Sequence, residues 1–376
     1  MSHTDKAIKI PLETISTWEN GKRRPQASAL QKLAKFYQVP VAYLLGEIDL
    51  AEDQEREVLY RGIPQNGEVR IEIDGWLDFL DAWADFLTSQ GREIQTFKTP
   101  KKLDRGLEED IRRAPTLAVE VRAHYDLGLD AISDLAGFLD SIGVLVYRAP
   151  LGSFRQMGSS QISGAYYNHP RLGSCILVNS DTTPGRQVFT LAHELAHAFY
   201  HYSAKGITSV SSHGSDPKER FANVFAAHFL VPGKALRYLV QECFVFHHLD
   251  PIRVMLLAVR MRVSYATMLM RLWEERLISI TQREEWKECS PRSLAVQLKL
   301  DPQWFEVPAI FDVEKIDAYP SSVLEIVKES LESSPISLSQ AAQLLKVKEA
   351  DLKRRLLSVT SKASDQESLE FEELPW

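Results

Sequence analysis

Apolar residues recur at helical spacing along the first part of the chain. In "SALQKLAKFYQ", Leu30, Leu33 and Tyr37 fall on one side of a helix. In "DGWLDFLDAWADFL" a stripe of aromatic and leucine side chains does the same, and core packing explains this stripe better than a ligand site. The pattern predicts helices over residues 11–20, 28–38, 74–87, 115–125 and 130–142.

After Gly143 the helical period gives way to short apolar runs rich in β-branched and aromatic residues. The runs "VLVYRA", "ISGAYYN" and "SCILVNS" are typical of strands, and "HPRLG" between the last two is typical of a hairpin connection. The sequence therefore predicts a small sheet of three strands, over residues 144–149, 162–168 and 174–180.

Helical spacing returns after the sheet. We expect a helix from Pro184 to about Tyr202, because Asp181 to Thr183 can cap it and proline suits a first turn. A second helix is expected within 215–232, further helices between 234 and 277, and a helix-turn-helix rhythm over 338–357. The fold class expected from this order is α+β and mainly helical.

Composition narrows the class of protein. The 376 residues carry 44 Lys and Arg against 51 Asp and Glu, a net charge of −7, which argues against a chain that coats nucleic acid through its overall charge. No apolar run approaches the roughly 20 residues of a membrane span. Cys175, Cys243 and Cys289 are odd in number and far apart, so we expect no disulfide framework and a cytoplasmic location.

The segment "FTLAHELAHAFYHY" concentrates metal-binding side chains on one helix. His193 and His197 are one turn apart, a spacing that lets two imidazoles bind one Zn²⁺. Glu194 lies about 100° around the helix from His193, where it can act as a general base instead of a ligand. A purely structural role would bury these polar groups in an apolar helix at a cost of several kcal/mol.

A catalytic zinc normally has a third protein ligand. His201 continues the row of histidines, but it lies about 12 Å along the helix from His193, too far to share one ion. Glu219, in the first turns of the next helix beside the small residues Ala222 and Ala226, is the preferred candidate. His213, Asp216 and His228 remain alternatives.

Two stretches, "RQVFTLAHELAHAFYH" and "KERFANVFAAHFLVP", resemble the ImmA/IrrE family of zincin-like metallopeptidases. The residues around Trp18 and Gly21 resemble the later helices of an XRE-type helix-turn-helix domain, which often accompanies that family. The resemblance implies zinc held by His193, His197 and Glu219, Glu194 as general base, and helix-turn-helix repressors as protein substrates. Asn223, four residues after Glu219, is expected either to support the site or to pack the helix.

The expected organisation follows from these assignments. Residues 1–46 form a partial helix-turn-helix, 47–114 a helical linker region, 115–235 the metallopeptidase domain, 236–358 a helical C-terminal region and 359–376 an acidic flexible tail.

The sequence also leaves alternative functions and alternative site residues open. The alternative function is a DNA-binding regulator or toxin-antitoxin component whose zincin module senses metal or a partner without turnover; Lys22, Arg23 and Arg24 would then contact phosphates. Tyr166, Tyr167 and His213 are candidates for oxyanion stabilisation. The oligomeric state is not predicted.

Overall fold

The computed structural model describes most of the chain after the N-terminal region. The described residues are Thr14, Trp18, 25–37, Val41, Leu45, 67–100, 111–152, 162–200, 207–210, 217–243, 248–300, 318–333 and 336–362. The chain divides into two compact units, Met1–Tyr60 and Arg61–Trp376. In the first unit, helix α3 (Ala27–Tyr37) confirms the helix expected there, whereas most of the helix expected over 11–20 lies outside the described residues.

The second unit is built around a mixed sheet with the strand order β1-β3-β2-β4. Strands β1 (Leu145–Ala149), β2 (Ile162–His169) and β3 (Gly173–Asn179) match the expected runs, and β4 (Ile207–Val210) was not predicted. Strand β1 pairs with β3 in parallel, and β2 pairs with both β3 and β4 in antiparallel fashion. The α+β class is thus confirmed, with one more strand than the sequence predicted.

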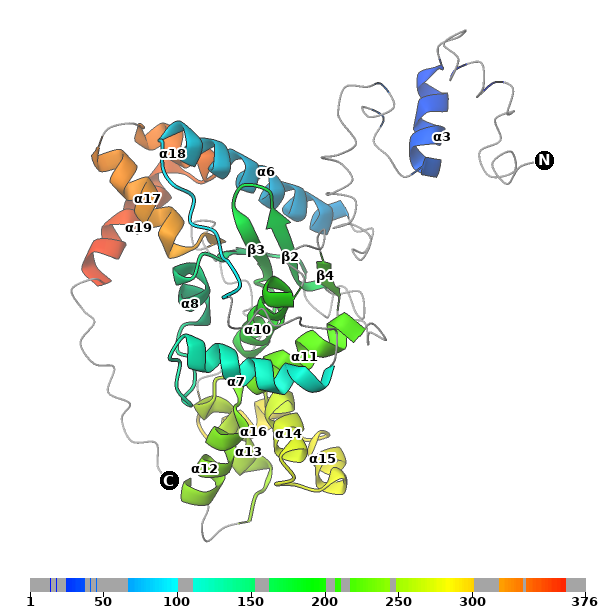
Figure 1. The fold of residues 1–376 in the computed structure, drawn as a ribbon, viewed down its shortest axis with the longest axis vertical. Coiled ribbons are helices and arrows are strands. Elements are labelled where there is room, and N and C mark those ends of the chain that lie inside the picture. The colour runs from blue at the N-terminus through cyan, green and yellow to red at the C-terminus, as the bar shows by residue number, and fades with distance from the viewer. Residues whose placement is uncertain are drawn as a thin grey trace. The chain divides into compact units, whose positions relative to one another are not determined.

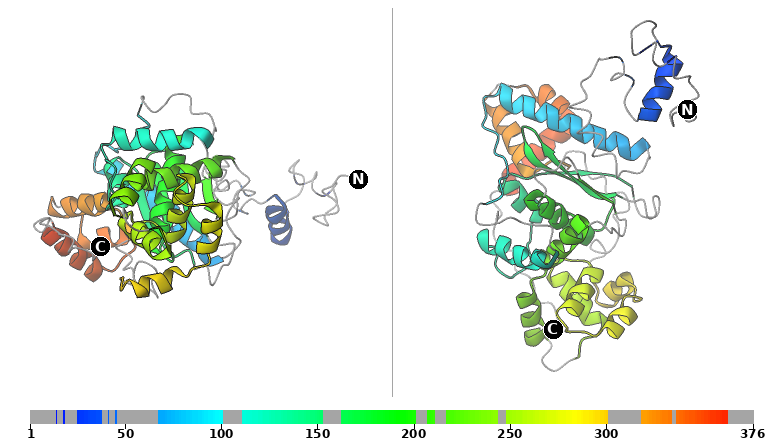
Figure 2. Two further views of the ribbon diagram at one scale, coloured as in Figure 1. Left: turned by 90° about the horizontal axis from the view of Figure 1, so that it is seen from below. Right: turned by 45° about the vertical axis from the view of Figure 1, so that its right-hand side comes forward.

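One face of the sheet packs against helix α10 (Pro184–Tyr200), and Figures 1 and 2 show α10 on that side. Alternation along the strands directs Tyr166, Ile176 and Val178 toward α10, and these side chains share a core with its apolar residues. Helices α11 (Pro217–Leu230) and α7 (Ala114–His124, after the 3-10 turn η1, Ile111–Arg113) pack beyond α10. The HELAH segment is therefore held between the sheet and α11.

The opposite face of the sheet is covered by helix α6 (Gly67–Ser89). Trp76 meets the ring of Tyr167 edge-on at 6.4 Å, and Phe79 stacks on Tyr147 at 5.7 Å. His169 lies 3.2 Å from the Asp81 carboxylate, which ties the end of β2 to α6. The aromatic stripe of this helix is core, as the sequence indicated.

The remaining described elements are helices. Helix α8 (Leu135–Ser141) is shorter than the expected 130–142, because Asp134 caps it by accepting a hydrogen bond from the amide of Gly137. The others are α12 (Gly233–Cys243), α13 (Pro251–Arg260), α14 (Tyr265–Glu274), α15 (Ile280–Trp286), α16 (Pro291–Gln297), α17 (Ser321–Glu332), α18 (Leu338–Leu344) and α19 (Glu349–Lys362). Residues of the expected acidic tail after Lys362 lie outside the described part.

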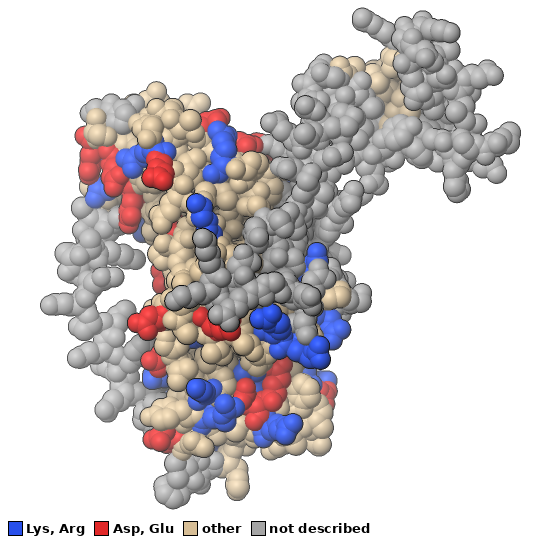
Figure 3. Space-filling model, in the orientation of Figure 1, with Lys and Arg blue, Asp and Glu red and all other residues tan. Residues whose placement is uncertain are grey.

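Surface and thiol features agree with the composition. Figure 3 shows basic and acidic side chains interspersed over the described surface of one face.

The two cysteines whose side chains the structure describes are both free. Cys175 is buried, and burial raises the pKa of its thiol; Cys289 is partly buried. No helix within the described ranges is both long and apolar enough to cross a membrane. The domain boundaries given above stay predictions.

A buried arginine fixes the position of α11. Arg122, on α7, donates hydrogen bonds to the carbonyl oxygens of Leu127, Gly128 and Asp130 and, at 2.8 Å, to that of Phe229 near the end of α11. Because Phe229 belongs to the last turn of α11, its carbonyl has no helical partner of its own, and Arg122 supplies the donor.

We expect Arg122→Ala to lower the free energy of unfolding by about 3 kcal/mol, because the buried carbonyl of Phe229 and three part-buried carbonyls lose a charged donor. Denaturant unfolding followed by circular dichroism measures this loss. Arg260→Ala, which removes an exposed arginine, is the control and should change stability by less than about 0.5 kcal/mol. Equal stability of the two variants would contradict the anchoring role.

Candidate metal centre

Helix α10 starts at Pro184, directly after β3 and a short turn. The amides of Arg186 and Gln187 donate to the carbonyl oxygen of Thr183, and the Gln187 side chain donates to the carbonyls of Ser180 and Thr182. This start sets the rotation of the helix. As a result, residues 191–199 are buried between the sheet and α11, with His193, Glu194 and His197 among them.

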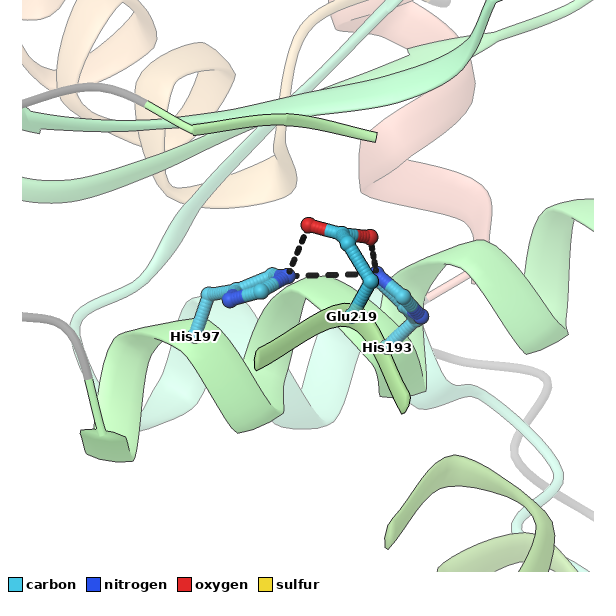
Figure 4. Close-up of side chains that lie close together, drawn as sticks. All are labelled: His193, His197 and Glu219. Atoms are coloured by element: carbon cyan, nitrogen blue, oxygen red, sulfur yellow. Dashed lines mark hydrogen bonds and ion pairs between the residues drawn. The ribbon is translucent and has the colours of Figure 1, made fainter. Parts of the chain in front are cut away.

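Three side chains converge at one point between α10 and α11. The Nε2 atoms of His193 and His197 are 3.1 Å apart. Glu219 Oε2 lies 3.1 Å from His193 Nε2, and Glu219 Oε1 lies 3.4 Å from His197 Nε2. Figure 4 shows both imidazoles rising from α10 and the carboxylate of Glu219 reaching over them from α11. The ligand atoms of these three residues all lie within 4.8 Å of one another.

The approach of the two helices depends on small side chains. Ala192 and Ala196 on α10, and Ala222 and Ala226 on α11, are completely buried. Because alanines let helix backbones come close, the carboxylate of Glu219 can reach the imidazoles without extending through a layer of large side chains. Ala222 and Ala226, which the sequence analysis noted beside Glu219, therefore lie where α11 packs closely on α10.

The electrostatic setting suits a cation. Burial disfavours the ionised form of Glu219, but hydrogen bonds and charge attraction from His193 and His197 outweigh this effect and hold its pKa well below its usual range. Both histidines are at most 3% exposed. A carboxylate that stays ionised beside two imidazole nitrogens in a nearly dry site supplies the negative charge that a divalent ion needs.

The spacing of the donor atoms also fits a tetrahedral metal ion. With metal–ligand bonds of about 2.0–2.1 Å, tetrahedral geometry separates neighbouring ligand atoms by about 3.3 Å. The three separations of 3.1, 3.1 and 3.4 Å are close to this value. Two imidazoles and one carboxylate are also the donor set of a common class of catalytic zinc site. The three residues therefore fit a metal ion in both geometry and chemistry.

Asn223 orients one of the imidazoles. Its Oδ1 lies 3.0 Å from Nδ1 of His193, one turn along α11 from Glu219. A proton on Nδ1 that is donated to this oxygen leaves the lone pair of Nε2 directed at the centre. Of the two roles expected for Asn223, the hydrogen bond favours support of the site over packing, since Asn223 is an exposed residue.

Glu194 lies on the side of α10 that faces the sheet, and its side chain is completely buried. Strand β2 makes room for it at Gly164. A Cβ placed on Gly164 would lie 2.5 Å from Thr190 Cγ2 and 2.7 Å from the carbonyl oxygen of Leu177, and 3.7 Å from Glu194 Oε1. The sequence analysis assigned no role to Gly164, although a glycine inside a strand is a recognised sign of close approach by another part of the chain.

The other candidates lie elsewhere. His228 is at the far end of α11, where its Nε2 is 2.9 Å from Arg271 Nη1; burial, together with the charge of Arg271, lowers its pKa to about 4. Tyr167 packs on α6, on the other face of the sheet from α10. Its side chain therefore points away from the metal centre and is not placed to stabilise an oxyanion there. Tyr166 is on the α10 face, with its hydroxyl 3.0 Å from Ser174 Oγ. His201, His213 and Asp216 lie outside the described residues.

We expect Glu219→Ala to weaken metal binding more than the ~10–100-fold that is typical of losing an outer-shell partner, because it removes a proposed direct ligand. Competition with a fluorescent chelator measures the affinity. His228→Ala is the matched control: it removes an alternative ligand whose Nε2 lies 2.9 Å from Arg271 Nη1 at the far end of α11, so the affinity of this variant should stay near wild type. Equal losses in both variants would show that the third ligand is misassigned.

Asn223→Ala should weaken metal binding by ~10–100-fold, because His193 loses the partner that fixes its tautomer. The same competition assay applies, and Asn223→Asp, which keeps an acceptor at this position, should recover most of the affinity. Unchanged binding in Asn223→Ala would contradict the orienting role.

Comparison with known families agrees with this geometry. Residues 140–273 match the model of the peptidase family described as the IrrE N-terminal-like domain, a stretch that includes β1 to β3, α10 and α11. Residues 4–44 match a helix-turn-helix model. No curated protein matches the sequence. The resemblance drawn from the sequence is therefore confirmed at the level of these two stretches: residues 140–273 are similar to the IrrE N-terminal-like peptidase domain, and residues 4–44 are similar to a helix-turn-helix.

Proposed function

We propose that the protein is a zinc-dependent endopeptidase of the ImmA/IrrE type that cleaves a helix-turn-helix repressor. The observation that carries this proposal is the convergence of His193, His197 and Glu219 at one point. Glu194 is buried on α10, the helix that also carries the two histidines. The match of residues 140–273 to a peptidase family supports it.

The proposed ligands are His193, His197 and Glu219, and the donor set of two nitrogens and one oxygen favours Zn²⁺ over harder ions such as Mg²⁺. When bound, the ion would supply Lewis-acid chemistry, polarising a carbonyl and making water more acidic. Asn223 would hold the ring of His193 in place, and the alanines between α10 and α11 would keep the carboxylate of Glu219 within reach.

Glu194 would move the proton. Its carboxylate would accept a proton from the attacking water and then deliver it to the nitrogen of the leaving amine, so that no serine or cysteine nucleophile is required. Complete burial strengthens this role, because a carboxylate in a site with little water interacts more strongly with a nearby proton donor. Gly164 leaves room for the carboxylate, since a Cβ at this position would lie 3.7 Å from Glu194 Oε1.

The substrate class rests on the family resemblance. ImmA/IrrE-type peptidases are expected to act on helix-turn-helix repressors of phage, mobile-element or stress-response circuits, which the protein would meet in the cytoplasm. The helix-turn-helix match at residues 4–44 is consistent with such a circuit, because it gives the chain itself a segment of the same class as the expected substrate.

A second candidate function is a DNA-binding regulator, or a toxin-antitoxin component, in which the metal site senses an ion or a partner. The match of residues 4–44 to a helix-turn-helix model favours it. In that case the metal-loaded protein would change DNA binding without cutting any protein.

The test is incubation of the purified, zinc-loaded protein with a helix-turn-helix repressor, chosen first from any that is encoded beside its gene. We expect two fragments with one major cleavage site, loss of cleavage when a chelator is added, and recovery when zinc is restored. A folded protein of similar size without a helix-turn-helix is the control substrate. An intact repressor, together with metal-dependent binding to DNA, would favour the regulator.

A further inference from the structure

The C-terminal helices α17, α18 and α19 form a compact three-helix unit on the α6 side of the second unit (orange to red in Figure 1). Tyr319, just before α17, packs between the rings of Phe79 and Tyr147, and its hydroxyl donates to the carbonyl of Leu345. The amide and hydroxyl of Ser322 both donate to the carboxylate of Asp140 on α8. This unit is thus attached to the sheet by buried contacts.

The connection between α18 and α19 has the geometry of a helix-turn-helix. Helix α18 begins with a capping box formed by Ser337 and Gln340. It ends at a tight turn in which Lys346 has a φ of 49° and the amide of Val347 donates to the carbonyl of Ala342. After this turn of a few residues, α19 starts at Glu349. A short turn of this kind is what sets the second helix across the first in DNA-binding motifs.

Burial divides the residues of this motif into two sets. The side chains that fix the crossing of the helices are buried: Ala341, Ala342, Leu345 and Leu352 are at most 4% exposed. The outer face of the turn and of α19 is exposed, and it consists of Lys348, Glu349, Ala350, Lys353, Arg354 and Leu357. We call these six residues the α19 face. Core packing explains the first set and leaves the α19 face without a role.

The α13–α14 pair shows that such a turn does not by itself leave the second helix accessible to DNA. Arg262 there has a φ of 54°, close to the 49° of Lys346, but one side of the following helix packs into the core. Tyr265, Met268 and Leu269 of α14 are buried in the main core. The α14–α15 pair has the same turn at Arg276, with a φ of 60°, and α15 is also largely exposed, but its exposed side chains include Glu284 and Glu285, whose negative charge is unfavourable beside DNA.

The chemistry of the α19 face suits double-stranded DNA. Three of its side chains are cationic and one is acidic, a local excess of positive charge on a chain whose net charge is −7. Arg354 is paired with Asp351 at 3.2 Å, an exposed contact that can exchange for a phosphate at little cost. Lysine and arginine read guanine edges or phosphates, glutamate accepts from cytosine, and alanine contacts the thymine methyl group.

We propose that α19 is the recognition helix of a second DNA-binding element, which places the α19 face in the major groove of duplex DNA. This element is separate from the helix-turn-helix match at residues 4–44 and does not rest on the peptidase activity. A peptidase with its own contact to DNA would act where DNA-bound repressors are found.

The test measures binding of the full-length protein to a short fluorescent DNA duplex of mixed sequence, by anisotropy over a range of salt concentrations. The variant combines Lys348→Ala, Lys353→Ala and Arg354→Ala, all at exposed positions. We expect at least a ~10-fold loss of affinity at low salt, and a plot of log affinity against log salt that is less steep by about 2–3.

Two further variants make the result specific. Lys234→Ala, Arg260→Ala and Lys287→Ala together remove the same charge from other exposed positions, and this control should bind within about 2-fold of wild type. A second triple variant, Lys22→Ala, Arg23→Ala and Arg24→Ala, tests the N-terminal segment.

Several outcomes would overturn the proposal. These are a wild-type protein that binds no duplex, equal losses in the α19 variant and the charge control, or an α19 variant that binds as wild type. Circular dichroism of the α19 variant is expected to match wild type, because the three side chains are on the surface; a lost helical signal would itself contradict the assigned exposure. An α19-dependent preference for single-stranded RNA over the duplex would also overturn it.

Discussion

Alanine at both His193 and His197 is expected to abolish binding of a divalent ion, and with it peptide cleavage. The two imidazole nitrogens are 3.1 Å apart and supply two of the three proposed ligands, so the remaining carboxylate of Glu219 cannot define a site alone. Elemental analysis of protein prepared without chelators measures this directly. We expect about one ion per chain in the wild type and a background level in the double variant.

The control for this experiment removes two histidines elsewhere. His124 and His248 are both exposed, and their double alanine variant should keep the full metal content. Circular dichroism establishes that each variant is folded before the metal is counted. An unchanged metal content in the His193 and His197 variant would mean that the ion binds at another place.

Glu194→Gln is expected to keep the metal and to reduce cleavage by about 10²–10⁴-fold, the usual contribution of general acid–base assistance. The amide has nearly the same shape as the carboxylate, so the packing of this side chain beside Gly164 should be preserved. The glutamine amide, however, cannot accept a proton from water as the carboxylate can. Steady-state cleavage rates and metal content, both measured on one preparation, separate these two effects.

Glu242→Gln is the matched control, because it makes the same chemical change at an exposed position of α12. Its rate should equal that of the wild type. A Glu194→Gln variant that retains both metal and full activity would assign the proton transfer to another group.

The histidine pair was the part of the site most accessible to sequence analysis. His193, Glu194 and His197 lie on one helix, and helical periodicity alone fixes their relative directions. Their spacing therefore carries three-dimensional information without any knowledge of the rest of the fold. Their catalytic and ligand roles stay predictions, which the experiments above test.

Glu219 needed more than periodicity. It comes from a different helix, and its approach to the histidines depends on how α11 turns back onto α10. Small residues at Ala222 and Ala226 indicated close packing but left His213, Asp216 and His228 as alternatives. The pairing of His228 with Arg271, a residue 43 positions later, is a long-range contact that no local pattern reveals.

The errors in the predicted fold also have local causes. Residues 130–134 have apolar and polar positions that suit a helix, but Asp134 takes the capping position and starts α8 there. Strand β4 has four residues, too short for a period-two pattern to be recognised. Tyr166 and Tyr167 are neighbours in sequence, yet the pleat of β2 sends them to opposite faces, so only the register of the sheet distinguishes them.

The most direct test of the central claim is a titration of metal-free wild-type protein with Zn²⁺ while cleavage of the repressor is followed. A peptidase with ligands His193, His197 and Glu219 predicts that the rate rises in proportion to bound zinc and levels off at one ion per chain. Cleavage at full rate without metal would contradict the proposed chemistry. Saturation of the site with no cleavage of any helix-turn-helix substrate would contradict the enzyme assignment itself and leave the metal centre as a sensor.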